Sequence, residues 1–223
     1  FLPKLLAPDP MLTAEEPWLL RYLWLPFYGL IAAGLIRGGY ATLEALARSP
    51  LLLALIALAF ASTLWSIEPD LTSRRAIAVA MTTLLGVWLA VRFDWLSLLR
   101  LLGAVWLILM AASLISGLIA PSFAVMDEIH PGAWSGGWWE KNQLGGHAAR
   151  AGFLFAFLAW RDTERRRLWA GGTVLATLLV LLSTSATSLV GLALGFAVLL
   201  AAAWMSGGRK RSLLLLWAGS AGL

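Results

Sequence analysis

Cysteine is absent from the 223-residue chain, and charged residues make up only 13% of it. The lack of cysteine excludes disulfides, thiolate metal sites and cysteine nucleophiles. An ordinary soluble domain carries about a quarter charged residues, whereas 60% of the residues here are hydrophobic. With a mean hydropathy of +0.81, the chain is expected to be an integral membrane protein.

Histidine is also scarce, because His130 and His147 are the only two. Two histidines without carboxylates placed beside them are a weak signal for a metal site, so neither a metal nor another cofactor is expected. The formal net charge is +5. In a membrane protein such an excess usually lies in cytoplasmic loops and sets the topology, so nucleic acid is not an expected partner.

Long apolar runs between short polar stretches predict an all-α, polytopic membrane protein, with residues 1–223 forming a single membrane-embedded helical domain. About seven spans are expected, followed by the start of an eighth. Because the last run has fewer than the ~20 residues needed for a crossing and no Met begins the chain, the sequence is expected to be truncated at both ends. The approximate ranges are 18–36, with a kink at Pro26, and 51–65, 76–91, 98–120, 147–160, 168–182, 189–205 and 212–223.

The distribution of lysine and arginine predicts the orientation of these spans. Eleven basic residues lie on the side that holds Arg161–Arg167, and five lie on the opposite side. The richer side is therefore cytoplasmic. Three polar segments then share the outer face: SIEPDLTSRR at 66–75, the central external loop at 121–146, and STSATS at 183–188. Such clustering is what a site at a membrane surface requires.

Arg74 and Arg75 begin the third span on the outer side, against the usual charge distribution. An arginine fork binds phosphate bidentately, and a helix N-terminus favours an anion. The alternative is that both arginines extend to lipid phosphates or pair with Glu68 and Asp70. The sequence leaves both readings open.

The central loop supplies further candidates. Lys141 is the natural contact for an anion, Glu140 is a base or an acceptor for sugar hydroxyls, and Asn142 is a donor or a helix cap. The alternative is that Glu140 and Lys141 only keep the loop solvated. His147 is either a general base or a packed interfacial histidine.

Trp138 and Trp139 suit a membrane–water interface, because their rings are apolar and their edges form hydrogen bonds. In STSATS the hydroxyl groups are expected to cap the following helix. A serine nucleophile there would need a base, and nothing marks one.

Three segments in order, LWSIEPDLTSRR, GAW…GWWEKNQLG and LLSTSATSLVGL, resemble the O-antigen ligase and polymerase superfamily, and most of all its exopolysaccharide-polymerase-like branch. The most specific element is Lys141-Asn142-x-Leu144-Gly145. Two departures are Glu140, where relatives often have histidine, and Ala186, where many have a basic residue. The family's large external loop with essential basic residues would follow the end of this chain. In the first of the three segments, the resemblance is also supported by Ser66, Pro69, Arg74 and Arg75.

The resemblance implies an inverting, metal-independent glycosyltransferase, a polymerase or ligase, in the bacterial inner membrane, with its site facing the periplasm. The donor would be a glycan linked through pyrophosphate to a polyprenyl lipid, and the acceptor a polysaccharide or lipid A-core. On this scheme Arg74, Arg75 and Lys141 clamp the pyrophosphate. Glu140 and His147 would be the catalytic residues. Asn142 and Glu140 would contact the sugar. Trp138 and Trp139 would stack on sugar rings or anchor the loop at the membrane interface.

A multispanning transporter or flippase of a lipid-linked or anionic solute is the alternative. Transporters place key polar groups near the middle of the membrane, whereas the expected spans carry almost no charge at that depth. A purely structural membrane subunit would leave the outer basic residues without a role. The enzyme interpretation is therefore favoured.

Overall fold

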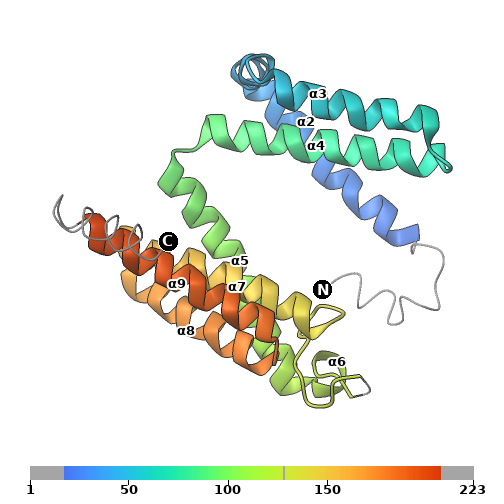
Figure 1. Cartoon of the computed structure of the whole chain (residues 1–223). Helices are drawn as coiled ribbons and strands as arrows, with labels where there is room; N and C mark the ends of the chain where they lie inside the picture. The colour runs from blue at the N-terminus through green and yellow to red at the C-terminus, as the bar shows by residue number, and fades with distance from the viewer. Residues whose placement is uncertain (1–17, 128, 207–223) are drawn as a thin grey trace, which may run out of the picture. The chain divides into compact units, whose positions relative to one another are not determined.

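The computed structural model describes residues 18–127 and 129–206, without the side chains of residues 18–24, 36–38 and 206. Within these ranges the protein is all-α, as expected, and the one β feature is an isolated bridge between Val125 and Trp134. The elements are α2 (Trp18–Ala47), α3 (Pro50–Ala61), the 3-10 helix η1 (Ser62–Trp65), α4 (Pro69–Arg92), α5 (Trp95–Ile119), α6 (Pro121–Ala124), α7 (Lys141–Arg161), α8 (Arg166–Leu182) and α9 (Ala186–Ser206) (Figure 1).

Among the described residues, three helices are long and apolar enough to cross a membrane, namely α4, α5 and α9, and the bent helix α2 would be a fourth if its two halves form one span. These apolar helices indicate association with a membrane. The α8 helix has 17 residues and α3 has 12, fewer than the ~20 of a simple crossing. The arrangement of seven spans therefore stays a prediction, and its eighth segment, 212–223, lies outside the described residues.

Each of the seven expected spans within the described residues falls on a helix, but some boundaries differ. The helix expected over 18–36 continues to Ala47, and a bend of 93° separates Leu25–Leu35 from Gly39–Ala47. The bend thus follows Pro26 by about ten residues, beside a pair of glycines, where backbone freedom is greatest. Proline begins α3 and α4, because its missing N–H costs nothing in the first turn.

The chain divides into two compact units, one with α2 to α4 and one with α5 to α9. In the α2–α4 unit, α2 and α3 both pack against α4. Gly34 of α2 lies against the Trp88 ring, where a Cβ would come within 3.3 Å of the indole. Because Gly34 has no side chain, α2 comes close to the Trp88 ring of α4, and this contact holds the two helices together.

In the α5–α9 unit, α7 packs against both α8 and α9, and the three lie side by side in Figure 1. The face of α7 that is fully buried repeats every three or four residues, as an amphipathic helix requires. Opposite it, Trp169 of α8 stacks on Phe155 with ring centres 6.1 Å apart. The buried residues of α7 are Leu144, Gly145, Ala148, Ala151, Gly152, Phe155 and Leu158.

A buried carboxylate joins three helices at the C-terminal end of α7. Asp162 is enclosed and accepts hydrogen bonds from Arg100 of α5, at 2.8 Å from Nε and 2.7 Å from Nη2. The indole N–H of Trp169 also donates to it, at 2.9 Å. The Arg100 hydrogen bonds hold the pKa of Asp162 at about 2, so the carboxylate is ionised and paired.

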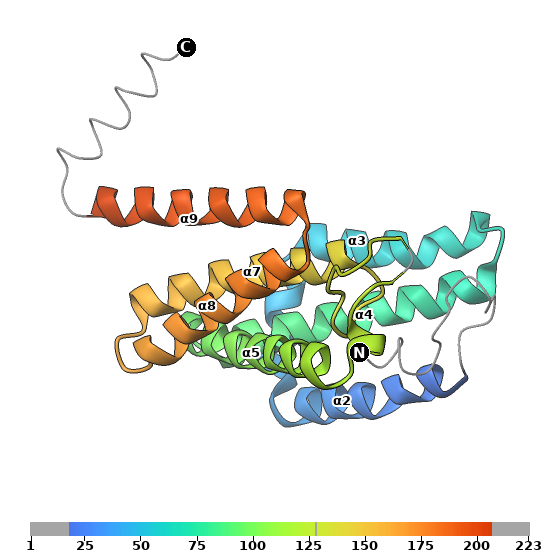
Figure 2. The same cartoon turned by 90° about the horizontal axis from the view of Figure 1, so that it is seen from below.

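Figure 2 shows the same helices from below and lets the reader follow α7 and α8 running next to each other. Gly103 of α5 lets that helix approach them, because a Cβ there would meet Leu158 at 2.7 Å and Trp169 at 2.9 Å. The α5–α9 unit thus has a close-packed core, with the ion pair of Arg100 and Asp162 at one end.

Candidate functional site

The central loop is shorter than the sequence predicted, because α7 begins at Lys141 and not near His147. The amides of Gln143 and Leu144 donate to the carbonyl of Glu140 at 3.1 and 3.2 Å, which starts the helix there. The Gln143 side chain accepts a bond from the Trp139 amide at 3.3 Å. The Lys-Asn-x-Leu-Gly element therefore forms the first turn of a helix.

The rest of the loop folds back onto its own unit through backbone hydrogen bonds. The amides of Ser135 and Gly136 both donate to the carbonyl of Ala124, at 2.8 and 2.9 Å. The Trp134 amide donates to the carbonyl of Leu182, at the end of α8, at 3.0 Å. Gly136 has φ +57°, a left-handed conformation that glycine adopts without strain.

Trp134 anchors the loop by packing its ring on Gly117 of α5. A Cβ at Gly117 would overlap the six-membered ring of Trp134. We expect Gly117→Ala to displace the loop and to lower the free energy of unfolding by about 1–3 kcal/mol. The measurement is limited proteolysis of the loop together with thermal unfolding. Gly86→Ala, whose Cβ would meet nothing within 4 Å, is the control; it should leave proteolysis of the loop unchanged and should not lower the unfolding temperature.

The Lys-Asn-x-Leu-Gly element and the serine-rich turn meet at Gly145. A Cβ on Gly145 would lie 2.7 Å from the hydroxyl oxygens of Ser183 and Ser188 and 2.9 Å from Cβ of Ser185. These three serines therefore leave room at position 145 for the hydrogen atom of glycine and not for a side chain. Lys141 reaches the same turn and donates from Nζ to Oγ1 of Thr184 at 3.5 Å. Two motifs separated by about 40 residues therefore form one structure.

The serine-rich turn is held in an uncommon backbone conformation. Thr184 has φ +51°, which a β-branched residue rarely adopts. It follows the end of α8, where glycine is usual. The hydroxyls of Ser185 and Ser188 are 2.9 Å apart, and the amide of Leu189 donates to the carbonyl of Ser185 at 3.0 Å. Ser185 directly precedes α9, and its hydroxyl is paired with that of Ser188, so capping of an α9 amide by these hydroxyls stays a prediction.

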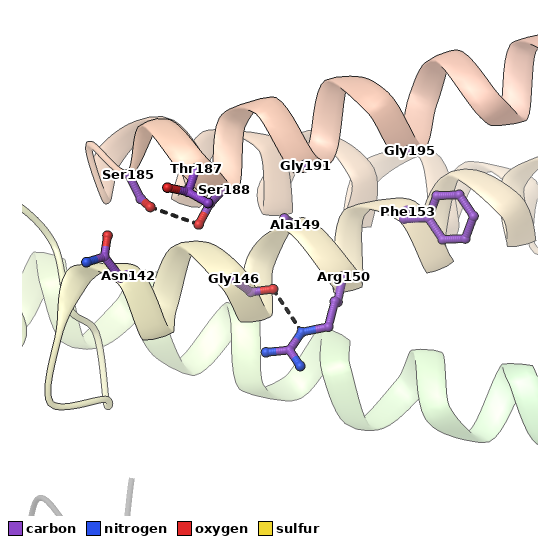
Figure 3. A pocket seen from close by; sticks show the side chains of 10 residues that line it. All are labelled: Asn142, Gly146, Ala149, Arg150, Phe153, Ser185, Thr187, Ser188, Gly191 and Gly195. Atoms are coloured by element: carbon purple, nitrogen blue, oxygen red, sulfur yellow. Dashed lines mark hydrogen bonds between the residues drawn. The ribbon is translucent and has the colours of Figure 1, made fainter.

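A pocket of about 660 Å³ opens between α7 and α9 beside this junction. One end is polar, with Asn142, Ser185, Thr187 and Ser188, and the other end is apolar, around Phe153 (Figure 3). Its size is within the range of about 300–1,000 Å³ that is usual for small-molecule sites. The full lining is Asn142, Gly146, Ala149, Arg150, Phe153, Ser185, Thr187, Ser188, Gly191 and Gly195.

His147 lies in an aromatic stack at the side of α7. Its ring is 5.0 Å from that of Trp138 and 5.3 Å from that of Trp106 on α5. Arg150 donates from Nη2 to Nδ1 of His147 at 3.2 Å. Since arginine can only donate, Nδ1 accepts and the ring carries its proton on Nε2. To act as a general base through Nδ1, His147 would have to release Arg150.

The expected site residues thus divide into three groups. Lys141 and Asn142 lie at the junction with the serine-rich turn, and Glu140 precedes them, exposed, at the N-cap of α7 without a side-chain capping bond. Trp138 is half-buried and stacks on His147, and the next residue, Trp139, is also half-buried. Arg74 and Arg75 are exposed on the first turns of α4, in the other unit.

Arg74 and Arg75 make few contacts of their own. Arg74 donates from Nε to the backbone carbonyl of Asp70 at 3.2 Å, and among the described residues neither Arg74 nor Arg75 forms an ion pair. Pairing with Glu68 or Asp70 therefore does not account for them. A common clamp with Lys141 stays a prediction, because each unit is described by itself.

Sequence reasoning did not assign a role to Arg150, and it gave the hydroxyls of the serine-rich turn a capping role but no place in a pocket. A signal for Arg150 was present, since it is a basic residue expected on the outer side, three positions after His147 and on the same helical face. The described residues hold no group of three or more histidine, aspartate or glutamate side chains arranged for a metal ion. Comparison with protein-family models, with curated proteins and with solved structures gives no match for this chain.

Proposed function

We propose that this protein is a membrane glycosyltransferase of the O-antigen ligase and polymerase type, acting at the outer face of the bacterial inner membrane. It would have about seven spans and the start of an eighth. The observation that carries the proposal is the packing of Gly145 into Ser183, Ser185 and Ser188. The two segments that resemble the second and third motifs of that family thereby line one pocket with a polar end.

The chemistry needs a pyrophosphate leaving group to be stabilised and an acceptor hydroxyl to be aimed. The acceptor oxygen forms a bond to the anomeric carbon, the bond from that carbon to the donor phosphate breaks, and the polyprenyl pyrophosphate departs. Lys141, with Arg74 and Arg75, would neutralise the charge on the leaving group. The hydroxyl proton would pass to a base, and the exposed carboxylate of Glu140 is the nearest candidate in sequence.

Asn142 fits the role of orienting a sugar, because it is exposed and lines the polar end of the pocket. The half-buried rings of Trp138 and Trp139 fit stacking on a sugar ring or holding the loop at the interface. For His147, the bond from Arg150 favours a role in orienting the loop through Trp138 over one in proton transfer.

The test uses the complete gene, deleted and then complemented, with surface glycan run on a gel. We expect Lys141→Ala and Arg75→Gln each to lower product by about 100-fold or more, the usual effect of removing one stabilising charge from a transition state. Arg92→Gln neutralises an exposed arginine at the other end of the same helix as Arg75 and should retain product at equal expression.

The gel also separates the alternatives. Loss of long chains with single repeats retained would identify a polymerase, and free lipid-linked polymer beside bare lipid A-core a ligase. Repeats that accumulate on the cytoplasmic side would favour a transporter or flippase. Full product from Arg75→Gln would exclude Arg75 from the clamp.

A further inference from the structure

Four arginines lie where α7 ends and α8 begins, at one end of the α5–α9 unit. The connection between the two helices is short, residues 162–165, so the four side chains belong to the same end. All four are exposed. They form the arginine patch, which consists of Arg161 in the last turn of α7, Arg165 before α8, and Arg166 and Arg167 at the start of α8.

The acidic side chains of this segment are bound to an arginine outside the patch. The buried Asp162 accepts hydrogen bonds from Nε and Nη2 of Arg100 on α5. The exposed Glu164 accepts one from the same Nη2 at 3.0 Å. Among the described residues, no arginine of the patch forms an ion pair. Arg100 thus takes both carboxylates of the segment, and the patch keeps its positive charge.

The backbone that carries the patch is anchored to the core. The amide of Arg165 donates to Oδ1 of the buried Asp162 at 3.4 Å, and the amide of Trp169 donates to the carbonyl of Arg165 at 3.2 Å. Trp169 is itself buried against Phe155. A ligand of the patch therefore meets a loop that is already held in place, which lowers the entropy cost of binding.

Helix stability accounts for only one of the four arginines. The helix dipole makes a cation stabilising in the last turn of a helix and destabilising in the first. Arg161 has the favourable position in α7, whereas Arg166 and Arg167 occupy the first turn of α8, where no acidic residue offsets them. Arg165 is the N-cap of α8 and makes no side-chain capping bond. An anion bound to these side chains would offset the unfavourable charge.

The same end of the unit carries tryptophans typical of a membrane–water interface. α7 and α9 both begin at the serine-rich turn, where Gly145 packs against Ser188, and they run side by side from there (Figure 1). Their last turns hold Trp160, which is half-buried, and Trp204, which is exposed. The guanidinium of Arg161 lies over the Trp160 ring, 6.0 Å from its centre. Since α9 is a candidate span and tryptophan gathers at the level of lipid head groups, this end is expected at that level.

We propose that the arginine patch binds the phosphate head groups of anionic phospholipids in the leaflet that borders this end of the unit. Guanidinium complements phosphate in charge and in geometry, because it donates two parallel hydrogen bonds to phosphate oxygens. Basic clusters beside membrane-spanning helices attract anionic lipids in this way. The patch lies at the opposite end of α7 from Lys141, so this binding goes beyond the proposed glycan transfer and does not depend on it.

The test titrates the full-length protein, in a neutral detergent, with phosphatidylglycerol or with phosphatidylcholine, and measures the affinity of the tightest site by native mass spectrometry. We expect phosphatidylglycerol to bind more tightly. Each arginine near a membrane surface raises the affinity for anionic lipid about fivefold. The triple variant Arg165→Gln, Arg166→Gln, Arg167→Gln should therefore lower the affinity for phosphatidylglycerol by about 100-fold and leave that for phosphatidylcholine unchanged.

Two single variants form a matched pair. Arg167→Gln and Arg92→Gln each remove an exposed arginine that forms no ion pair among the described residues. The first should lower the affinity for phosphatidylglycerol about fivefold, and the second should leave it unchanged. Glu164→Gln removes the exposed negative charge beside the patch and should raise the affinity, a gain that a misfolded protein would not produce.

Four results would each overturn the proposal. They are equal affinity for the two lipids, an equal loss in Arg92→Gln and Arg167→Gln, no gain in Glu164→Gln, and displacement of phosphatidylglycerol by inorganic phosphate at constant ionic strength. The last result would identify a site for a soluble anion, because a lipid held also by its place in the membrane is not displaced by the free head-group chemistry alone. Since no glycan is measured, none of these results bears on the proposed function.

Discussion

Asp162→Ala is expected to lower the free energy of unfolding by about 3–5 kcal/mol, the usual cost of breaking a buried ion pair by removing one partner. The Asp162 side chain has no exposed surface, and it joins α5, α7 and α8 through Arg100 and Trp169. Its removal leaves a partly buried guanidinium and a buried indole N–H without their acceptor. Denaturation in detergent, followed by helix content, measures the change.

Glu164→Ala is the matched control, because Glu164 also binds Arg100, at 3.0 Å, but its side chain is 76% exposed. It should cost no more than about 1 kcal/mol. Asp162→Asn keeps the shape and some of the hydrogen bonds, so its loss should fall between the two. An Asp162→Ala protein as stable as the Glu164→Ala protein would show that the cluster does not hold the unit together.

The same carboxylate predicts how stability depends on pH. The folded-state pKa of Asp162 is about 2, below the ordinary value of 3.8, chiefly because of its hydrogen bonds from Arg100. The stabilisation is therefore complete above the ordinary value and is lost as the pH falls toward 2. Wild type should lose stability in that window, and Asp162→Ala should lose less of it there.

Gly145→Ala is expected to lower glycan transfer by about 100-fold, because a shift of about 1 Å at a site has that effect. The added methyl would lie within 3.0 Å of Ser183, Ser185 and Ser188, so the serine-rich turn must move away from α7. Alanine also favours the helix by about 1 kcal/mol over glycine, which offsets part of the cost of overpacking. The variant should therefore fold but transfer little glycan. Glycan on a gel and thermal unfolding are measured together.

Gly171→Ala in α8 is the control for this change, since its added Cβ has open space, and it should retain both glycan and stability. A further variant, Ser183→Gly with Gly145→Ala, removes one of the two hydroxyls that the methyl would strike and should restore part of the activity. Full transfer by the single Gly145→Ala variant would mean that the contact between turn and helix has no part in the reaction.

Some of the candidate residues named from the sequence lie together in the structure, while their roles stay predictions. The order of the motifs named Lys141, Asn142 and the serine-rich turn as candidates, and the structure brings these together. The role of Arg150 and the existence of the pocket were not predicted, although Asn142 and the serine-rich turn, which line it, were named from the sequence. A pocket depends on which faces of two helices meet, and the spacing of residues along one helix does not specify its partner.

The sequence by itself determined that the chain is helical, apolar and suited to a membrane, because these properties follow from composition and from the length of apolar runs. It also marked most helices, since proline and charge interrupt them locally. Only the tertiary structure decided that Lys141 begins a helix, that Asp162 is a buried ion-pair partner and not a loop charge, and that Gly145 fits among three serines. The reason is physical: burial and close packing join residues far apart in the chain, and no local pattern records the partner.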